Sequence, residues 1–129
     1  MRDLIFIAGG GALGALARYG VAVQARRLWG VDFPWGTLLV NLLGCLLLGA
    51  VLEAARIGPP GANVSRGLQV FLAVGFLGAF TTFSTFGVES VSLFMAGKPG
   101  EALAYVIGSV ALGLAGSAAG ILVMRTALG

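Results

Sequence analysis

The chain has 129 residues, of which 58% are hydrophobic and 10% are charged, and its mean hydropathy is +1.00. An average soluble domain carries about 25% charged residues, so this composition predicts a single membrane domain over residues 1–129, surrounded by a lipid bilayer. The net charge of +3 rests on eight scattered Lys and Arg, which excludes a nucleic-acid partner. With no histidine and one cysteine, the chain lacks a disulfide framework, a structural zinc site and histidine-based catalysis, and we do not expect an enzyme.

Four apolar segments are long enough to cross about 30 Å of hydrocarbon as helices. They cover residues 4–25, 35–55, 68–96 and 102–127, and turn-forming Pro or Gly residues separate them at residues 26–34, 56–67 and 97–101. We therefore expect an all-α, multi-pass membrane protein. A cleaved secretory signal at residues 1–20 is disfavoured, because Asp3 opposes the basic start and glycines dilute the apolar core.

Positive charges are almost balanced between the two ends of these segments. One end carries Arg2, Arg56, Arg66 and Arg125, and the other carries Arg26, Arg27 and Lys98 with Arg18 approaching it. The positive-inside rule therefore gives no preferred direction of insertion. Two copies inserted in opposite orientations would form an antiparallel dimer about a twofold axis in the membrane plane. A single orientation set by other cues is equally compatible with these charges.

The first segment contains GGGALG at residues 9–14, which matches the dinucleotide-binding pattern G-x-G-x-x-G. That pattern has meaning only between a strand and a helix, and the flanking segments are membrane-length apolar runs. The spacing of Gly10 and Gly14, like that of Gly116 and Gly120, instead predicts close contact between helices.

Arg18 lies 15 residues beyond Asp3, which is about 22 Å along a helix. A charge at the centre of a membrane helix costs about 2.5–3.5 kcal/mol on insertion scales. Two roles remain open for Arg18. Its side chain either reaches the interface beside Tyr19 or lines a vestibule that attracts anions.

Polar side chains share one face of the second segment, because Thr37 and Asn41 are four residues apart and Cys45 follows one turn later. An asparagine near the middle of a membrane helix needs a hydrogen-bond partner. Asn41 either bridges two helices or donates its amide hydrogens to a passing anion.

The fourth segment repeats this spacing with Tyr105, Ser109 and Gly113. Such a row of donors can line a path. Serine and threonine in membrane helices often bond to their own backbone instead, so this row carries little weight alone.

The third segment contains FLGAFTTFSTFG at residues 76–87. Gly75, Gly78 and the pair Thr81-Thr82 have low helix propensity near the middle of this segment, which predicts a broken helix. Non-helical backbone at membrane depth occurs only inside protein or along water, and its carbonyl groups form ion sites. Two antiparallel copies would bring two breaks together, where converging carbonyl oxygens suit Na+.

Phe83 and Phe86 are three residues apart and share one face after this break. Aromatic ring edges carry partial positive charge, so two edges can favour an anion without holding it tightly. Lipid contact or core packing is the alternative role for such a pair. Glu89 follows on the same flank and has no obvious partner within its own segment.

Together, the stretches GGGALGALARYG, PWGTLLVNLLG and GFLGAFTTFSTFGVES resemble the Fluc (CrcB) family of fluoride channels, and the resemblance covers nearly the whole chain. It implies four transmembrane helices with a broken third helix, arranged as an antiparallel, dual-topology homodimer. It also implies passive export of fluoride across a bacterial cell membrane through two pores, with a structural Na+ at the centre.

The resemblance further assigns roles to individual residues. The backbone carbonyls of Gly78 and Thr81 match the sodium ligands, and Arg18 and Glu89 match charged positions of the family. The fluoride pathway would be lined by the phenylalanines, the amide and the hydroxyl groups of Phe83, Phe86, Asn41, Ser84, Thr85, Thr37, Tyr105 and Ser109. One departure is Gly113, where some members carry a pore-lining serine.

Two other functions compete with this interpretation. A small proton-coupled exporter of cationic drugs also has four spans, but it needs a carboxylate within the membrane. Glu53 lies near a segment end, so Glu89 is the remaining candidate. An accessory subunit that only packs in a larger complex would explain the glycines, but not the clustered Thr, Ser and Phe.

Overall fold

The computed structural model describes residues 1–57 and 65–129. Part of the predicted connection at 56–67, residues 58–64, lies outside the described residues. All regular elements in the two described ranges are helical, which confirms the predicted all-α class. They are α1 (Arg2–Trp29), α2 (Trp35–Ile57), α3 (Arg66–Gln69), the π-helix η1 (Val70–Leu77), α4 (Gly78–Phe80), α5 (Phe83–Met95) and α6 (Pro99–Leu128).

Among the described residues, four helical segments are long and apolar enough to cross a membrane, as predicted: α1, α2, the run Arg66–Met95 and α6. Helical structure extends past the predicted windows, since backbone hydrogen bonding does not stop where the apolar run stops. Gly30 after α1 and Gly97 after α5 have φ of 79° and 76°. Glycine adopts these left-handed conformations without a steric penalty.

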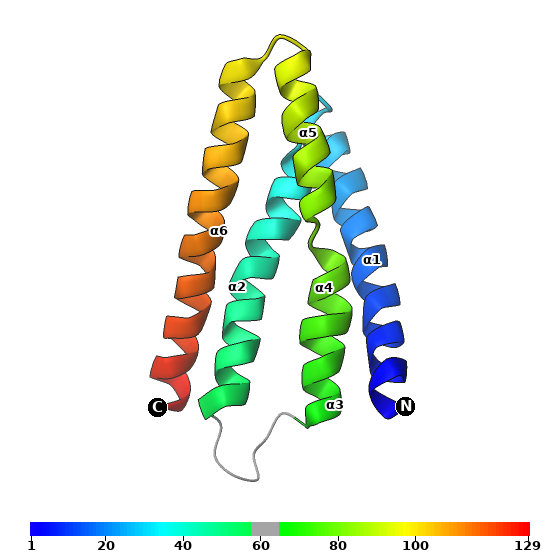
Figure 1. The fold of residues 1–129 in the computed structure, drawn as a ribbon, viewed down its shortest axis with the longest axis vertical. Helices are drawn as coiled ribbons and strands as arrows, with labels where there is room; N and C mark the ends of the chain where they lie inside the picture. The colour runs from blue at the N-terminus through cyan, green and yellow to red at the C-terminus, as the bar shows by residue number, and fades with distance from the viewer. Residues whose placement is uncertain (58–64) are drawn as a thin grey trace.

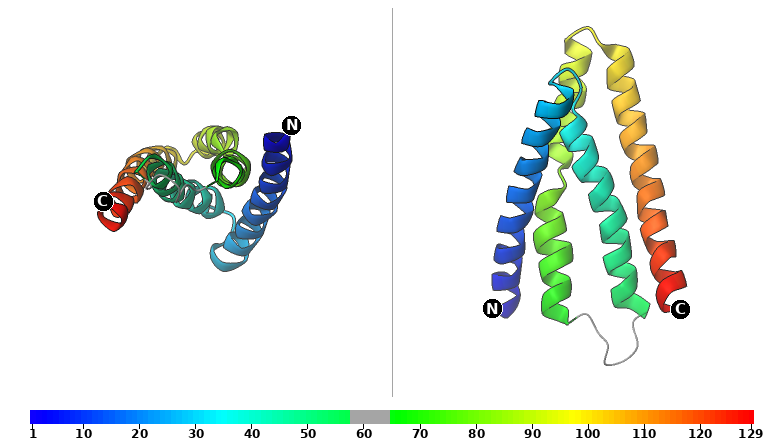
Figure 2. Two further views of the ribbon diagram at one scale, coloured as in Figure 1. Left: turned by 90° about the horizontal axis from the view of Figure 1, so that it is seen from below. Right: turned by 180° about the vertical axis from the view of Figure 1, so that it is seen from behind.

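The segments run up and down, as Figure 1 shows. Both chain termini, the end of α2 and the start of α3 lie at one end of the molecule, which we call the lower end. The α1–α2 and α5–α6 connections lie at the opposite, upper end. The two further views in Figure 2 show α2 beside α6, and α1 beside the segment formed by α3, η1 and α4.

Glycines allow these neighbouring backbones to touch. A Cβ atom added to Gly14 of α1 would overlap the carbonyl oxygen of Phe76 in η1, and one added to Gly120 of α6 would overlap the carbonyl oxygen of Leu46 in α2. In a membrane, small residues permit the close van der Waals contact that holds helices together. The glycine contacts predicted from sequence spacing are confirmed.

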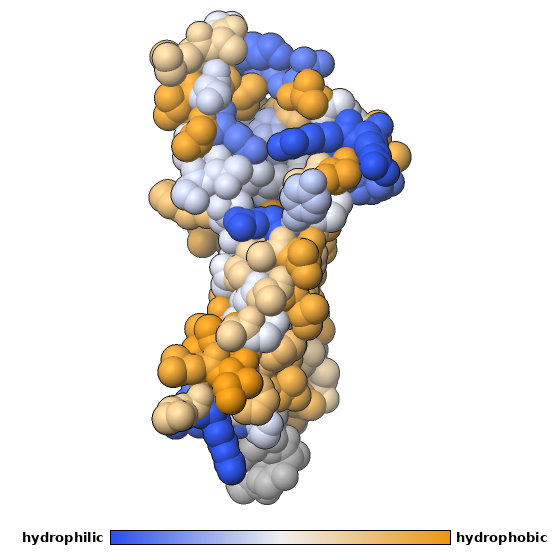
Figure 3. Space-filling view, turned by 90° about the vertical axis from the view of Figure 1, so that its right-hand side faces the viewer, coloured by the Kyte–Doolittle hydropathy of each residue, from blue (hydrophilic) through white to orange (hydrophobic). Residues whose placement is uncertain are grey.

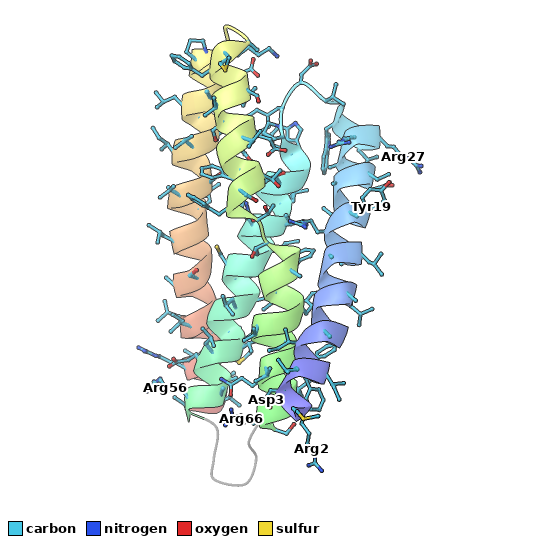
Figure 4. The ribbon with its side chains drawn as sticks, turned by 45° about the vertical axis from the view of Figure 1, so that its right-hand side comes forward. Arg2, Asp3, Tyr19, Arg27, Arg56 and Arg66 are labelled. Carbon is cyan, nitrogen blue, oxygen red and sulfur yellow. The ribbon has the colours of Figure 1, made fainter. Side chains whose placement is uncertain are left out.

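On the face shown in Figure 3, apolar side chains dominate from the narrow centre downward, and hydrophilic side chains gather in the upper part and again near the lower end. At the lower end, Arg66 binds Asp3 at 2.9 Å, which joins α3 to α1. Figure 4 shows these two residues together with Arg2 and Arg56 at this end, and Arg27 at the other. This distribution matches the apolar centre and polar surfaces of a bilayer.

We predict that Gly14→Ala destabilises the protein, because its methyl group would collide with the backbone of η1. The expected loss is about 1–3 kcal/mol in the free energy of unfolding, measured by denaturant titration in detergent micelles. Gly20→Ala is the matched control on the same helix, since a Cβ at Gly20 meets nothing within 4 Å. Equal stability of the two variants would contradict this account of α1 packing.

Candidate functional site

Thr81 and Thr82 separate α4 from α5. Their backbones are extended, with φ and ψ of −86° and 159° at Thr81 and −153° and 116° at Thr82. The Thr82 hydroxyl oxygen accepts a hydrogen bond from the backbone N–H of Thr85 at 3.2 Å and thereby caps α5. The Thr81 hydroxyl donates to the carbonyl of Leu77 at 3.0 Å. The two threonines thus supply hydrogen bonds to both helix ends that meet here.

Asn41 of α2 pairs with both backbone polar groups of Thr82. Its side-chain oxygen accepts from the Thr82 N–H at 2.8 Å, and its amide nitrogen donates to the Thr82 carbonyl at 3.0 Å. In a continuous α-helix that N–H would bond to the carbonyl of Gly78. Of the two roles left open by the sequence, the structure therefore displays the helix-bridging one. The amide nitrogen still has a second hydrogen to donate.

Gly44 allows α2 to approach this pair of extended residues. A Cβ atom at Gly44 would overlap the methyl group of Thr81. Asn41 and Gly44 therefore act together, since one supplies the hydrogen bonds and the other supplies the space. No pattern within either segment indicates this pairing.

The two phenylalanines after Thr82 differ in exposure. Phe83 is 84% exposed, whereas Phe86 packs at 5.2 Å between ring centroids against Tyr105. The centroids of Phe83 and Phe86 lie 5.7 Å apart with their planes tilted by 45°. Phe33 of the first connection meets Tyr105 edge-on at 5.5 Å. Most of the Phe83 ring is therefore not covered by any other part of the same chain.

Glu89 connects three helices. One carboxylate oxygen accepts from the Thr37 hydroxyl at 2.9 Å and the other accepts from the Tyr105 hydroxyl at 2.8 Å. Both donors are buried, with Tyr105 only 1% exposed. Glu89 has no obvious partner within its own segment, and its hydrogen-bond donors come from α2 and α6 instead.

Ser84 and Thr85 lie in the exposed first turn of α5. The Thr82 hydroxyl donates to the Thr85 hydroxyl at 3.0 Å, and the Ser84 hydroxyl lies 3.3 Å from the Thr82 hydroxyl. This cluster places three hydroxyl groups at the N-terminus of a helix, where backbone N–H groups favour negative charge. Exposed donors of this kind can meet an anion.

A cavity of about 450 Å³ lies between α2, α6 and the extended residues, and we call it the groove. Four of the predicted pathway residues line it: Asn41, Phe83, Phe86 and Ser109. The oxygen of Ser109 is buried and, within the described ranges, is without a hydrogen-bond partner. Other polar groups along the groove come from Thr81, Thr82, Cys45 and Ser117.

A second cavity, of about 420 Å³, opens at the upper end, and we call it the upper cavity. Thr37 and Glu89 line it together with Arg26, Asp32 and Lys98. Arg18 is half-buried on α1 and is among the lining residues of neither cavity. Some of the predicted residues therefore line the groove and others line the upper cavity, whereas Arg18, Gly78, Ser84, Thr85 and Tyr105 line neither.

From its sequence, Thr82 is part of the predicted helix break and has no other role, although its side chain and backbone form five hydrogen bonds or close polar contacts. A threonine directly before a helix-forming run is a common N-cap pattern and would have been an available signal. Cys45 follows Asn41 by one turn on the same face of the second segment, but its place in the groove, like that of Ser117, depends on how α2 and α6 pack.

A protein-family model described as "CrcB-like protein, Camphor Resistance (CrcB)" matches residues 5–121. The chain belongs to the CrcB family. A protein of Rhizobium leguminosarum bv. trifolii named "Fluoride-specific ion channel FluC" is 43% identical over 127 residues, covering 97% of this chain and 98% of the relative. A protein of the same name from Thermus thermophilus is 46% identical over 114 residues, covering 88% of each chain.

Membership of the CrcB family confirms the resemblance drawn from the sequence motifs. Together with the four helical segments long enough to span a bilayer, it makes the chain a multi-pass membrane protein with bacterial relatives. Those relatives carry the names of ion channels and not of enzymes.

We predict that Asn41→Ala exposes the backbone of Thr82, because both of its polar groups lose their partner. Hydrogen exchange of the Thr82 amide should become at least about tenfold faster, since an unmade hydrogen bond costs about 1–3 kcal/mol. Mass spectrometry of peptides covering residues 81–85 measures this. Ser109→Ala is the control, because its hydroxyl bonds to no described group. Unchanged exchange in Asn41→Ala would disprove the bridging role.

Proposed function

We propose that this chain is a fluoride-selective channel of the cell membrane, which lets fluoride leave the cell passively and so lowers its cytoplasmic concentration. The observation that carries the proposal is the groove, where the Asn41 amide, the Ser109 hydroxyl and the Phe83 and Phe86 rings converge beside the extended residues. The names of the relatives, fluoride-specific ion channels, support the same substrate.

The chemistry of the groove suits fluoride. Fluoride is small, strongly hydrated and a strong hydrogen-bond acceptor, so a pore must replace its water with donors. Ser109 has a hydroxyl without a partner among the described residues, and Asn41 has one amide hydrogen beyond the one given to Thr82. Ring edges add weak positive charge. Several weak contacts in a row allow an ion both to enter and to leave.

Polar groups continue beyond the groove toward the upper end. Tyr105 and Thr37 give their hydroxyl hydrogens to Glu89, and Glu89 lines the upper cavity. Ser84 and Thr85 present exposed hydroxyl groups near Phe83. Arg18 lies on the neighbouring helix α1. Its charge would make the electrostatic potential near the pathway more positive and so attract an anion.

The functional unit in this proposal is an antiparallel homodimer of dual topology, with the third helix broken at Thr81 and Thr82. Two observations support it. Phe83 is 84% exposed in the single chain although it borders the groove, and the groove is open along one side. A second copy in the opposite orientation would cover both and would form two equivalent pathways about the twofold axis.

A structural Na+ at the dimer centre completes the proposal. The Thr82 N–H, which a continuous helix would direct to the carbonyl of Gly78, is taken by Asn41, so this carbonyl has capacity for another partner. The carbonyls of Gly78 and Thr81 from two copies would supply oxygen ligands, which a small hard cation prefers. Such an ion would hold the two chains together at their breaks.

A proton-coupled drug exporter is less compatible with the carboxylates. Glu53 binds Arg56 at 2.7 Å and Arg125 at 2.6 Å and is 6% exposed. A carboxylate held by two arginines is a poor group for exchanging a proton with a cationic substrate. Glu89 is engaged by two hydroxyl groups.

We predict that vesicles containing the protein lose fluoride rapidly and retain chloride, as followed with ion-selective electrodes. Phe83→Ile and Asn41→Asp should each reduce fluoride efflux by at least about tenfold, because they remove a ring edge and an amide donor from the pathway. Phe94→Ile is the matched control, since Phe94 lies on the same helix, is 66% exposed and lines neither cavity.

The dimer should remain intact in both variants, as checked by size-exclusion chromatography. Wild-type efflux in both would mean that the two residues only pack. Efflux of fluoride that requires a proton gradient would contradict a passive channel.

We predict that dual topology places either end of the molecule on either side of the membrane. In a Cys45→Ala background, Gly100→Cys marks the upper end and Thr126→Cys marks the lower end, and both positions are exposed. A membrane-impermeant thiol reagent applied to intact cells should label about half of each variant, because the charge balance favours neither direction. Complete labelling of one variant and none of the other would rule out dual topology.

A further inference from the structure

Polar groups line the groove on the lower side of Asn41. Cys45 lies one turn beyond Asn41 on α2, and both line the groove together with Ser109 and Ser117 of α6. Ser109 and Ser117 are eight residues apart and so share a helix face, with Gly113 midway between them. The row of serine side chains on α6 is therefore interrupted at Gly113, which has no side chain.

The Cys45 thiol lies opposite that gap. A Cβ atom built on Gly113 would be 3.4 Å from the Cys45 sulfur, and one built on Gly116 would be 3.9 Å from the Cys45 Cβ. The two helices are close enough here for α2 to supply the side chain that α6 lacks. The order of polar groups along the groove is then Ser109, Cys45 and Ser117.

The buried hydroxyl of Ser109 gives independent evidence that this row meets a polar species. Its oxygen is inaccessible and, among the described residues, has no hydrogen-bond partner. A buried polar group left unpaired costs about 1–3 kcal/mol, so such groups normally have a partner in the working protein. Because Ser109 borders the groove, a rotation of its side chain would bring the hydroxyl to water or an ion in the groove.

We propose that the Cys45 thiol lines the fluoride pathway beside Gly113 and that its modification blocks the channel. This inference rests on the proposed fluoride conduction. A thiol is a weak hydrogen-bond donor, so it can contact fluoride without retaining it, as conduction through several sites requires. Because the chain has one cysteine, a thiol reagent acts at this position alone.

The test uses methyl methanethiosulfonate on the full-length protein reconstituted in vesicles. The Cys45 sulfur attacks the reagent, forms a mixed disulfide with its methylthio group and releases methanesulfinate. Fluoride efflux should fall by at least about tenfold, because the added group narrows the pathway. Dithiothreitol should restore it. Efflux through Cys45→Ala should not respond to the reagent, and intact-mass measurement gives the modified fraction.

Substitutions distinguish a donor on the pathway from a residue that only packs. Cys45→Ser keeps a donor and Cys45→Val keeps the approximate volume without one. A pathway donor predicts that the serine variant conducts at least about fivefold faster than the valine variant. A packing residue predicts the reverse order, since valine suits an apolar contact better.

Three results would overturn the inference: complete modification with unchanged efflux, a thiol that reacts only after denaturation, or faster efflux through Cys45→Val than through Cys45→Ser. None of these contradicts fluoride conduction itself. Untreated wild-type protein that releases no fluoride would instead contradict the proposed function, whatever the behaviour of Cys45.

Discussion

The structure depends on the pairing of Asn41 with the backbone of Thr82. Inside a bilayer there is no bulk water to satisfy an exposed N–H or C=O, so backbone without helical hydrogen bonds needs partners within the protein. One side chain of α2 supplies both partners, at 2.8 and 3.0 Å. The Thr82 hydroxyl then caps the next helix. A two-residue extended stretch can therefore persist between α4 and α5 at membrane depth.

This pairing constrains how the other helices pack. Asn41 reaches Thr82 only if α2 lies very close to the extended residues, and Gly44 makes that approach sterically possible. Further along α2, Gly49 lies against the carbonyl oxygen of Ser117, and Gly120 of α6 lies against that of Leu46. The backbones of α2 and α6 are thus in close contact at these glycines. The groove is the space that remains between α2, α6 and the extended residues.

Glu89 and Tyr105 connect the groove to the upper cavity. Tyr105 packs against Phe86, a residue of the groove, and donates its hydroxyl hydrogen to Glu89, a residue of the upper cavity. Hydroxyl, amide and aromatic groups thus succeed one another from one cavity to the next. In the proposed channel, the hydrogens free to contact an anion in this series are the hydroxyl hydrogen of Ser109 and the second amide hydrogen of Asn41.

Local sequence properties were sufficient for much of the architecture. Hydropathy predicted four membrane-length helices, and the spacing of Gly10 and Gly14 predicted the close contact of α1. Low helix propensity around Gly78 pointed to the region in which Thr81 and Thr82 are extended. Each of these inferences needs only the residues of one segment, because apolar burial and helix propensity are properties of neighbouring residues.

Only the tertiary structure decided which polar groups meet. Thr37 and Glu89 are 52 residues apart in the chain, and Asn41 and Thr82 are 41 apart. From the sequence alone, Asn41 has two possible roles and Glu89 has no partner, because hydrogen bonds form only between groups that lie within about 3 Å of each other. That proximity arises from the packing of different helices, which periodicity and composition within one segment do not specify.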